Sequence, residues 1–484
     1  MSRGRLFVAG LAVLCGTTTV IGATGTGAAA APAAAREVAP RVFPASVTVD
    51  TKDVVGATSS SYIGLTFESG TLNSEPYDNV GDLARLLANL GAGIMRFGGT
   101  TADEAYTGAT PAALGGLARL TDASGWSVQY TEDLGHYNAA EVRNDAAAVA
   151  KALGPHLAAI ACGNEPNAYR TNGMRSTDYT EAEYAKQVAA CYEQVRAGAP
   201  HVPLEGPDAF GNPGFLAQYA KQMAGKIAWL TEHIYPLRCV GEASLVGVTP
   251  AKFDAELLSP LIAGKEYAGF GYMLADAEIA HAQLHITETN SACGGGLPGA
   301  SNSYATALWV IDYLLIGAER GVAGFNFSGG LGSNCDDYTV LCETANGSDE
   351  WTGNPIYYGM LFARMLGTGR MVKVAVKTQA KSDFVTAFAV TPDKGAALRV
   401  MVENLSSSHT SVSVRVGGHP ATVGVLRMAE PPAGLTATDD IKIQGATLAA
   451  NGTLKPGKAT AVKCSGGVCP LSLTPYSAAL MTVG

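Results

Sequence analysis

Short apolar runs alternate with polar loops and Ala-rich helical stretches between Ser61 and about Ser328. A short apolar run is typical of a buried strand, and a longer stretch with helical periodicity is typical of an amphipathic helix. The predicted strands are Tyr62–Phe67, Gly93–Phe97, Trp126–Thr131, Leu157–Gly163, Val202–Gly206, Ala228–Tyr235, Gln283–Glu288 and Val322–Phe327. The predicted helices include Val80–Leu90, Asn144–Leu153, Glu181–Gly198 and Ser303–Arg320. Eight strands that alternate with helices predict an α/β fold, a (β/α)8 TIM barrel.

A doubly wound open sheet is the competing architecture, because hydrophobic periodicity alone does not distinguish it from a barrel. An open sheet that binds a dinucleotide would carry a G-x-G-x-x-G turn after its first strand. No such turn follows Phe67. The barrel is therefore the favoured prediction.

The pattern changes after about Met371, where β-rich runs separated by Gly and Pro replace the helical stretches. These runs are Phe384–Val390, Ala397–Asn404, Ser411–Val416 and Ser472–Thr482. They predict a C-terminal antiparallel β-sandwich. The strand-like stretch Val47-Thr48-Val49 could add a strand to it. The expected organisation is a barrel over residues 61–370, a sandwich over 371–484, and an N-terminal segment over 36–60 that joins the sandwich.

The first 35 residues have the layout of a secretory signal peptide. Two arginines lie within Ser2–Arg5, an apolar run follows over Leu6–Ala12, and small residues dominate from about Ala23 to Ala35. A transmembrane anchor is the alternative, but Gly and Thr interrupt the apolar run well short of the ~18 residues that a spanning helix needs. We therefore expect a secreted protein without a membrane anchor, cleaved near Ala35.

Eight cysteines remain once Cys15 leaves with the signal peptide, and an even number in an exported chain suggests disulfides. They are Cys162, Cys191, Cys239, Cys293, Cys335, Cys342, Cys464 and Cys469. Cys464–Cys469 and Cys335–Cys342 are close enough in sequence to close small loops. Cys162–Cys191 could tie a strand end to the next helix. No C-x-x-C or H-x-x-x-H spacing accompanies these cysteines, so a zinc site is disfavoured.

The net charge of −9 and the pI of about 5.4 limit the possible partners. Nucleic acids and long polyanions require a basic surface, so we expect no nucleic-acid partner. One acidic sugar in a pocket remains compatible with this charge. We expect a monomer.

Two carboxylates lie directly after predicted strands. Glu165 stands in the run Cys162–Asn167 (Cys-Gly-Asn-Glu-Pro-Asn) after the fourth strand, and Glu288 in Ile286–Asn290 (Ile-Thr-Glu-Thr-Asn) at the end of the seventh. The carboxyl ends of barrel strands meet at one face, where barrel enzymes have their active sites. A pair of carboxylates there is the equipment of a glycosidase. The alternatives are a helix-start glutamate favoured by the macrodipole for Glu165 and a solvated loop carboxylate for Glu288.

Three ordered motifs carry a resemblance to glycoside hydrolase family 79, which contains the β-glucuronidases and heparanase. They are Met95–Thr100 (Met-Arg-Phe-Gly-Gly-Thr), Gly163–Asn167 (Gly-Asn-Glu-Pro-Asn), and Glu288–Ser291 (Glu-Thr-Asn-Ser) followed by Gly294–Gly296. The resemblance covers about Ser61 to Gly367. It implies a retaining barrel glycosidase that acts on a carbohydrate without a metal or organic cofactor. Glu165 would be the acid/base and Glu288 the nucleophile, with the two carboxyls about 5–5.5 Å apart.

The same resemblance assigns roles to other residues, each of which has a plainer alternative. Asn164 would bond the sugar 2-hydroxyl, and Tyr235 would orient the nucleophile unless it is a core aromatic residue. Arg96 could keep the nucleophile ionised by charge pairing, or it could form a structural ion pair in the barrel. Glu68 and Thr100 fall where the family binds ring hydroxyls, although either could be a polar loop residue.

A glucuronate carboxylate needs donors of its own. In the resembling enzymes, backbone N–H groups of the glycines after the nucleophile and tyrosine hydroxyls supply them, which points to Gly294, Gly295 and Tyr338. A flexible surface loop is the alternative for these glycines. The chain departs from the pattern at Cys293, where relatives often carry a tyrosine. An exo-acting β-glucuronidase is the favoured function. The alternatives are a heparanase-like endo-β-glucuronidase, which the acidic charge disfavours, a β-glycosidase for a neutral sugar, and an inactive carbohydrate-binding barrel.

Overall fold

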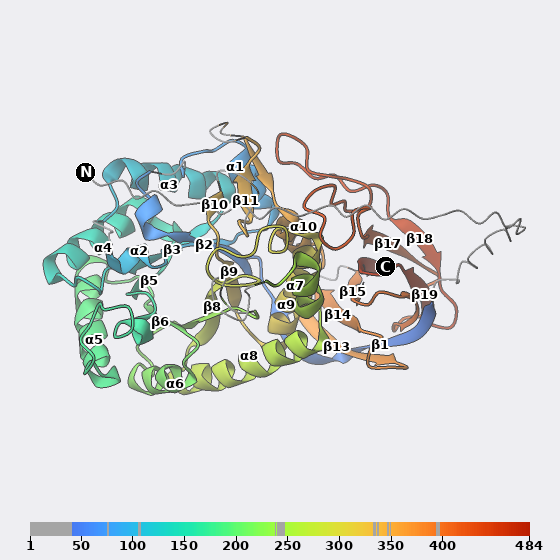
Figure 1. Cartoon of the computed structure of the whole chain (residues 1–484), viewed down its shortest axis with the longest axis horizontal. Helices are drawn as coiled ribbons and strands as arrows, with labels where there is room; N and C mark the ends of the chain where they lie inside the picture. The colour runs from blue at the N-terminus through green and yellow to red at the C-terminus, as the bar shows by residue number, and fades with distance from the viewer. Residues whose placement is uncertain are drawn as a thin grey trace, which may run out of the picture. The chain divides into compact units, whose positions relative to one another are not determined.

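The computed structural model describes residues 41–484, apart from 75–76, 105–107, 238, 240–246, 333–334, 336–337, 346–347, 349 and 394–396 (Figure 1). The predicted signal peptide, with its cleavage region and Cys15, lies outside the described residues. Among the described residues, no helix combines the length and apolar character needed to cross a bilayer.

Eight parallel strands form a barrel with the order β5-β4-β3-β2-β9-β8-β7-β6. They are β2 (Ile63–Glu68), β3 (Ile94–Gly98), β4 (Ser127–Glu132), β5 (Leu157–Cys162), β6 (Glu205–Phe210), β7 (Trp229–Ile234), β8 (Gln283–Thr289) and β9 (Gly324–Phe327). A parallel bridge between Ile160 and Leu204 joins the two ends of the sheet. The predicted (β/α)8 barrel is confirmed.

One predicted barrel strand is misplaced. The apolar run predicted a strand over Val202–Gly206, whereas β6 occupies Glu205–Phe210. Glu205 and Asp208 are both fully buried in β6. Glu205 accepts a hydrogen bond from the side chain of Gln129 in β4, and Asp208 forms an ion pair with Arg96. Because polar side chains are satisfied inside the barrel, the strand does not look apolar in the sequence.

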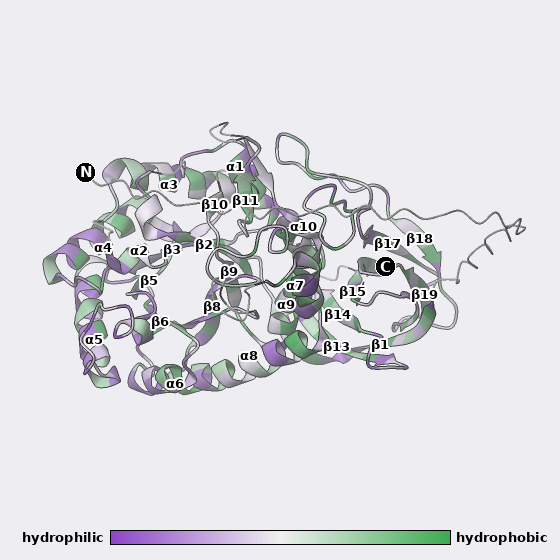
Figure 2. Ribbon diagram, in the orientation of Figure 1, coloured by the Kyte–Doolittle hydropathy of each residue, from purple (hydrophilic) through white to green (hydrophobic). Residues whose placement is uncertain are grey.

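Helices cover the outside of the barrel, where α5 and α6 carry both hydrophilic and hydrophobic residues (Figure 2). The helices are α1 (Asp82–Asn89), α2 (Thr101–Glu104), α3 (Pro111–Ser124), α4 (Ala139–Leu153), α5 (Glu181–Gly198), α6 (Pro213–Gln222), α7 (Pro250–Leu257), α8 (Pro260–Ala280), α9 (Tyr304–Arg320) and α10 (Pro355–Arg364). Short 3-10 turns lie at η1 (Ser69–Thr71), η2 (Gly154–His156) and η3 (Pro166–Ala168).

The sequence pattern located four of these helices and missed others that have clear start signals. The predicted helix Glu181–Gly198 is α5, which begins with a reciprocal capping box between Thr180 and Glu183. The helices α3, α6 and α8 each begin at a proline that follows a capping Thr110, Asn212 or Ser259. A cap followed by proline is a readable helix start, so these three could have been found.

A second sheet has nine strands in the order β18-β17-β20-β15-β14-β13-β1-β16-β19. They are β1 (Val42–Thr58), β13 (Gly369–Thr378), β14 (Val385–Pro392), β15 (Leu398–Asn404), β16 (His409–Arg415), β17 (Thr422–Met428), β18 (Thr460–Lys463), β19 (Val468–Leu473) and β20 (Ser477–Val483). The stretch Val47-Thr48-Val49 lies in β1, which pairs antiparallel with β13 and parallel with β16. The sheet therefore holds one parallel pair among antiparallel ones, and it forms the predicted sandwich. A small sheet comprises β10 (Leu331–Gly332), β11 (Leu341–Glu343) and β12 (Trp351–Gly353).

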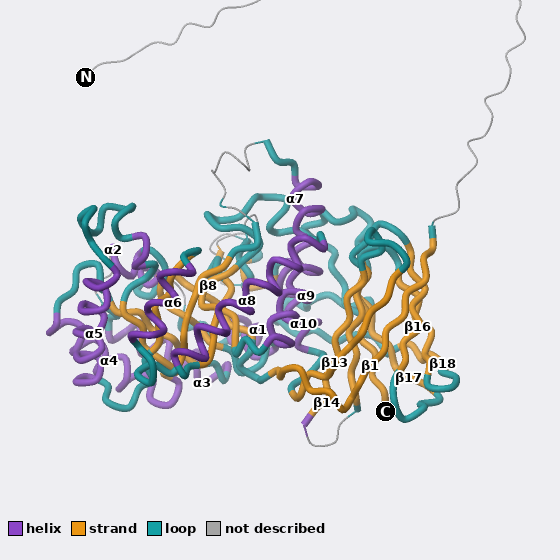
Figure 3. The backbone as a smooth tube through the Cα atoms, turned by 90° about the horizontal axis from the view of Figure 1, so that it is seen from below, coloured by secondary structure: helices purple, strands orange, loops and turns teal. Residues whose placement is uncertain are grey.

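The helix α9 lies between the barrel strands and the second sheet (Figures 1 and 3). It is buried from Tyr304 to Ala318, so it contacts neighbours on all sides. A Cβ on Gly56 of β1 would lie 2.0 Å from the carbonyl oxygen of Ala318, so only glycine allows this approach. The backbone contact ties β1 to the barrel helices.

Four disulfides are present. Three are the pairs suggested by sequence spacing: Cys162–Cys191, Cys335–Cys342 and Cys464–Cys469. The fourth joins Cys239 to Cys293 across 54 positions.

Buried carboxyl groups predict that stability falls as the pH rises. Glu266 accepts a hydrogen bond from the Trp309 indole, and burial raises its pKa to about 8. Burial likewise raises the pKa of Asp312 to about 7. These carboxyls hold protons in the folded state and release them when the protein unfolds. Their contribution to the free energy of unfolding is therefore present at low pH and is lost as the pH rises through the folded-state pKa. The free energy of unfolding should drop by about 2 kcal/mol between pH 6.5 and 8.5.

Urea unfolding at the two pH values measures this drop. Glu266→Gln keeps an acceptor for the indole and should flatten the dependence, whereas Glu256→Gln, on the exposed face of α7, should leave it unchanged. Equal unfolding free energies at both pH values in the wild type would contradict the prediction.

Candidate active site

Glu165 and Glu288 come together at the carboxyl ends of β5 and β8. One oxygen of each carboxyl and a ring nitrogen of His233 all lie within 4.8 Å of one another. The two glutamate side chains are 28% and 15% exposed, so they remain accessible from solvent, while the histidine is fully buried. The pairing inferred from the sequence is therefore present in the fold.

Irregular backbone conformation sets the direction of the Glu165 and Glu288 side chains. Glu165 adopts a left-handed conformation with φ of 48°, and its N–H donates to the carbonyl of Asp208 at 2.8 Å. Glu288 lies where the β8–β9 register shifts, between Ile286 and Thr289. Such shifts redirect side chains at barrel rims.

Glu288 is held by two donors. The hydroxyl of Tyr235 donates to Oε1 at 2.8 Å, and the guanidinium of Arg96 lies 3.3 Å from Oε2. Both oxygens are thus held by hydrogen-bond donors, one of which is a cation. The contacts expected for Tyr235 and Arg96 are both observed.

Arg96 also organises the surrounding polar groups. It is fully buried and donates to Asn164 Oδ1 at 2.8 Å and to Asp208 Oδ2 at 3.0 Å. Burial alone would raise the pKa of Asp208, but Arg96, His233 and the Thr287 hydroxyl together hold it below its usual value. Arg96 consequently contacts both Asp208, in a buried ion pair, and Glu288.

His233 and Asp208 were not singled out from the sequence. His233 Nδ1 lies 2.9 Å from Glu165 and 3.7 Å from Glu288, and Nε2 lies 3.8 Å from Asp208. Thr231 on the same strand accepts a hydrogen bond from the Asp208 N–H. Because alternate strand residues share a face, the spacing of Thr231, His233 and Tyr235 was a usable signal for His233. Asp208 lay beyond the end of the predicted strand.

Asn164 is fixed by its backbone as well as by Arg96. Its N–H donates to Asp103 Oδ2 at 2.7 Å, and the Tyr169 hydroxyl donates to the same oxygen. The N–H groups of Leu134 and Gly135 donate to the other oxygen at 2.9 Å. Burial raises the pKa of Asp103 despite these donors. Asp103, on the short helix α2, was also missed by the sequence analysis.

Glu68 and Thr100 lie at the end of β2 and just before α2. Glu68 Oε2 accepts hydrogen bonds from the N–H and the hydroxyl of Thr101, the residue after the predicted Thr100. Thr100 is exposed. Neither side chain has a hydrogen bond to Glu165 or Glu288 among the described contacts.

The segment after Glu288 packs against the ring of Tyr338. A Cβ on Gly296 or Gly329 would lie 2.5 or 2.8 Å from its ring, so the ring packs on backbone at both positions. The Tyr338 hydroxyl is 3.3 Å from Ser328 Oγ. Burial raises the pKa of Tyr235, and the nearby Glu288 and Tyr338 raise it further.

The predicted glycines lie farther out on this segment. Gly294 and Gly295 are exposed and have φ of 73° and 87°, which suits glycine. Cys293 precedes them as a disulfide partner of Cys239, so it offers no thiol proton.

The grouping of Glu165, His233 and Glu288 could in principle supply metal ligands. However, His233 Nδ1 is engaged with Glu165, and the Arg96 cation lies on Glu288. A metal ion here would meet a fixed positive charge at 3.3 Å from one of its ligand residues. The donor set suits a carboxyl pair better than a metal centre.

The chain is similar to known glycoside hydrolases. No protein-family model matches the chain. A β-glucuronidase from Aspergillus niger is 26% identical over 272 residues, which are 53% of this chain and 49% of that protein. The chain thus matches about half the length of this curated relative.

Solved structures of similar fold are glycoside hydrolases. A 4-O-α-L-rhamnosyl-β-D-glucuronidase from Fusarium oxysporum superposes with a TM-score of 0.71 at 20% identity, over 92% of this chain and 100% of that chain. The family 51 arabinofuranosidase from Xanthomonas axonopodis gives 0.65 at 15% identity, over 91% and 100%. At these identities the likeness establishes the fold, a TIM barrel with an accompanying β-sandwich.

Proposed function

We propose that this protein is an exported retaining β-glycosidase that releases terminal β-D-glucuronosyl groups by double displacement. The observation that carries the proposal is the approach of Glu165 and Glu288 to within 4.8 Å. Retaining enzymes place their carboxyls about 5–5.5 Å apart, whereas inverting enzymes leave about 6.5–9.5 Å for a water molecule. The family 79 motifs and the similarity to an Aspergillus β-glucuronidase support the glucuronidase assignment.

Glu288 would attack the anomeric carbon. Tyr235 and Arg96 contact its two oxygens, which fixes the orientation of the carboxyl group. Attack forms a glycosyl-enzyme ester as the bond to the leaving oxygen breaks.

Glu165 would protonate the leaving oxygen and then deprotonate the water that hydrolyses the ester. His233 Nδ1 lies 2.9 Å from this carboxyl, and the other ring nitrogen, Nε2, lies 3.8 Å from Asp208. The imidazole ring has two nitrogens that can carry a proton, so the hydrogen bond between His233 and Glu165 can persist in both steps of the cycle.

Asn164 would bond the sugar 2-hydroxyl through its amide. Its Oδ1 accepts from Arg96, so the NH2 group faces away from the guanidinium and is available as a donor. Bonds to this hydroxyl strengthen in the transition state of glycosidases.

Tyr338 and the backbone of Gly294 and Gly295 would bind the glucuronate carboxylate. The Cys239–Cys293 disulfide removes one potential donor, which favours a neutral sugar as the second candidate substrate. Export is supported by the four disulfides, because such bonds persist in oxidising compartments.

Hydrolysis of the chromogenic β-D-glucuronide beside the glucoside, galactoside and xyloside tests the function. We expect the glucuronide to have the highest kcat/KM. Turnover of a neutral glycoside alone would move the proposal to the second candidate, and no turnover by folded protein would indicate a carbohydrate-binding barrel.

Tyr338→Phe tests how the sugar is selected. Loss of one hydrogen bond to a carboxylate should lower kcat/KM for the glucuronide by about 10–100-fold. Turnover of any neutral glycoside should change little, because that sugar lacks the carboxylate. Tyr272→Phe, on an exposed tyrosine of α8, is the matched control. Equal losses on all substrates would assign Tyr338 to packing instead.

A further inference from the structure

Phe210 is the last residue of β6, and the register of the barrel sheet turns its side chain toward the carboxyl pair. It pairs with His233 of β7, which in turn pairs with Glu288 of β8. Partners in register on neighbouring parallel strands point to the same face of the sheet. His233 points at the carboxyls, since Nδ1 lies 2.9 Å from Glu165 and 3.7 Å from Glu288. The Phe210 side chain therefore shares the face on which the carboxyls meet.

Two sets of contacts fix the position of Phe210. Its N–H donates to Asn167 Oδ1 at 3.1 Å, and the Asn167 side-chain amide donates to the Phe210 carbonyl at 2.9 Å. Its ring meets the ring of Tyr235 edge to face, with centroids 5.8 Å apart and planes at 85°. Asn167 comes two residues after Glu165, and Tyr235 donates to Glu288. Phe210 thus contacts both the segment that carries Glu165 and the tyrosine that holds Glu288.

Phe210 differs from the inward-facing residues below it because it is accessible. Asp208 and His233 are 0% and 1% exposed, whereas Phe210 and Tyr235 are half-buried. The ring is therefore at the catalytic end of the barrel, where substrates of barrel enzymes bind. A phenyl ring there offers a flat apolar surface to a ligand.

The position of Phe210 relative to Glu165 indicates which part of a substrate it would meet. The acid of a glycosidase lies beside the leaving oxygen, so the residues around it border the aglycone. The Glu165 N–H donates to the carbonyl of Asp208, two residues before Phe210. Together with the Asn167 contacts, this bond holds the end of β6 against the Glu165 segment. Phe210 would therefore lie on the aglycone side of the bond that breaks.

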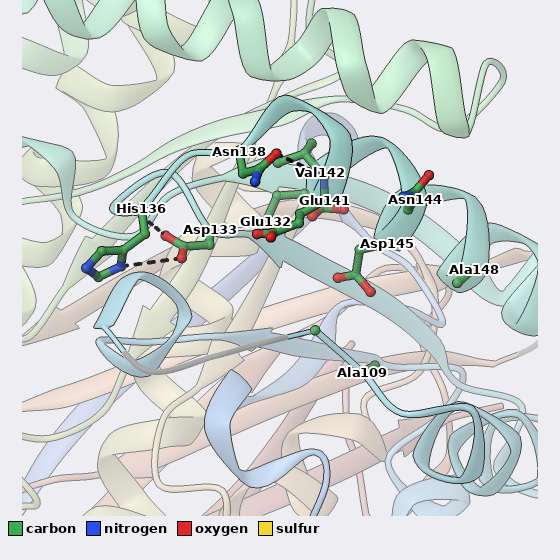
Figure 4. A pocket seen from close by; sticks show the side chains of 11 residues that line it. Ala109, Glu132, Asp133, His136, Asn138, Glu141, Val142, Asn144, Asp145 and Ala148 are labelled. Carbon is green, nitrogen blue, oxygen red and sulfur yellow. Dashed lines mark hydrogen bonds and ion pairs between the residues drawn. The ribbon is translucent and has the colours of Figure 1, made fainter.

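A separate pocket of about 320 Å³ borders the end of β4 and the first turns of α4, where Figure 4 shows the carboxyl groups of Glu132, Asp133 and Asp145. Its lining residues all fall between Gly108 and Ala148. The pocket therefore does not include the ends of β5 to β8, and its carboxyl groups do not suit an apolar group. The end of β6 is the better place for the aglycone.

We propose that Phe210 binds the aglycone by packing its ring against a flat apolar face of the group attached to the leaving oxygen. This inference rests on the proposed function, because it takes Glu165 as the acid. An aromatic ring and the C–H face of a second sugar both present such a surface. The protein should accordingly prefer either of them to a small alkyl aglycone.

Hydrolysis of benzyl and methyl β-D-glucuronide by the full chain tests the proposal, with the matching pair of a neutral glycoside if the wild type prefers that sugar. Both aglycones leave as alcohols that need a proton from Glu165, so the main difference between them is the ring. The wild type should show a kcat/KM about tenfold higher for the benzyl glycoside, and Phe210→Ala should bring this ratio close to one. A wild-type ratio near one, or equal losses for both substrates in the variant, would overturn the proposal.

Further variants separate the flat face from mere bulk. Phe210→Leu keeps an apolar side chain against Tyr235 but no flat ring, so it should lower the ratio, whereas Phe210→Tyr should retain it. Phe384→Leu makes the same change at a half-buried phenylalanine just before β14 and should leave the ratio unchanged. A wild-type ratio in Phe210→Leu would contradict the role of the ring. A glucuronosyl disaccharide distinguishes the sources: if its kcat/KM also falls in Phe210→Leu, the ring binds a sugar face as well, and otherwise it selects aryl groups.

A binding measurement separates this inference from the proposed function. Glu288→Gln should bind without turnover, and calorimetry should show that it binds benzyl β-D-glucuronide about tenfold more tightly than the methyl glycoside. Adding Phe210→Ala should remove the difference. This difference in binding, with no turnover by folded wild type, would overturn the reaction but keep the aglycone site. Turnover by the wild type with no difference in binding would overturn the aglycone site alone.

Discussion

Glu288→Gln should reduce turnover of the best glycoside by on the order of 10⁴-fold or more, which is typical for loss of an enzymatic nucleophile. Glutamine keeps an oxygen that can accept from Tyr235, so the change removes the charge and the nucleophile but little packing. The measurement is kcat with substrate in excess, on protein whose circular dichroism and melting temperature match the wild type.

A control variant and a labelling reagent make the result specific. Glu278→Gln changes an exposed glutamate in the same way and should leave kcat unchanged. A 2-deoxy-2-fluoro glycoside of the preferred sugar should form a stable adduct with the wild type, and peptide mapping should locate it on Glu288. Near-normal turnover of Glu288→Gln, or labelling of another residue, would contradict the nucleophile assignment.

The sequence was sufficient to predict the barrel and the proximity of Glu165 and Glu288, because both predictions depend on local patterns. Short apolar runs such as Leu157–Ala161 in β5 mark barrel strands in the sequence, and Glu165 and Glu288 come shortly after such runs. Local capping chemistry would also have located α3, α6 and α8. These features need no knowledge of which distant residues meet.

The parts that escaped prediction depend on tertiary contacts. Asp208 is a buried acid whose presence makes sense only beside Arg96, which is 112 positions away. His233 was passed over because its partners come from β5, β6 and β8. The same reason applies to Cys239–Cys293, whereas Cys464–Cys469 and Cys335–Cys342 close loops short enough to be suggested by spacing. Contacts between residues that are distant in the chain cannot be predicted from one sequence.

Glu165→Ala should lose activity in a way that depends on the leaving group. For an alkyl glycoside, whose leaving oxygen must be protonated, kcat/KM should fall by about 10²–10⁴-fold. The 4-nitrophenolate of a 4-nitrophenyl glycoside leaves without protonation. Formation of the glycosyl-enzyme ester should therefore be nearly unaffected, while hydrolysis of the ester becomes slow. A burst of nitrophenol followed by slow turnover would show this change directly.

Azide should rescue Glu165→Ala, because the vacated carboxyl position admits a small anionic nucleophile that needs no base. In a retaining enzyme azide attacks the glycosyl-enzyme ester on the side from which the aglycone left, so the product should be the β-glycosyl azide. Glu165→Gln provides the matched control, since its side chain occupies the space that azide needs and should prevent rescue. NMR of the product decides the assignment: an α-glycosyl azide would mean direct displacement, and the roles given to Glu165 and Glu288 would then have to be exchanged or abandoned.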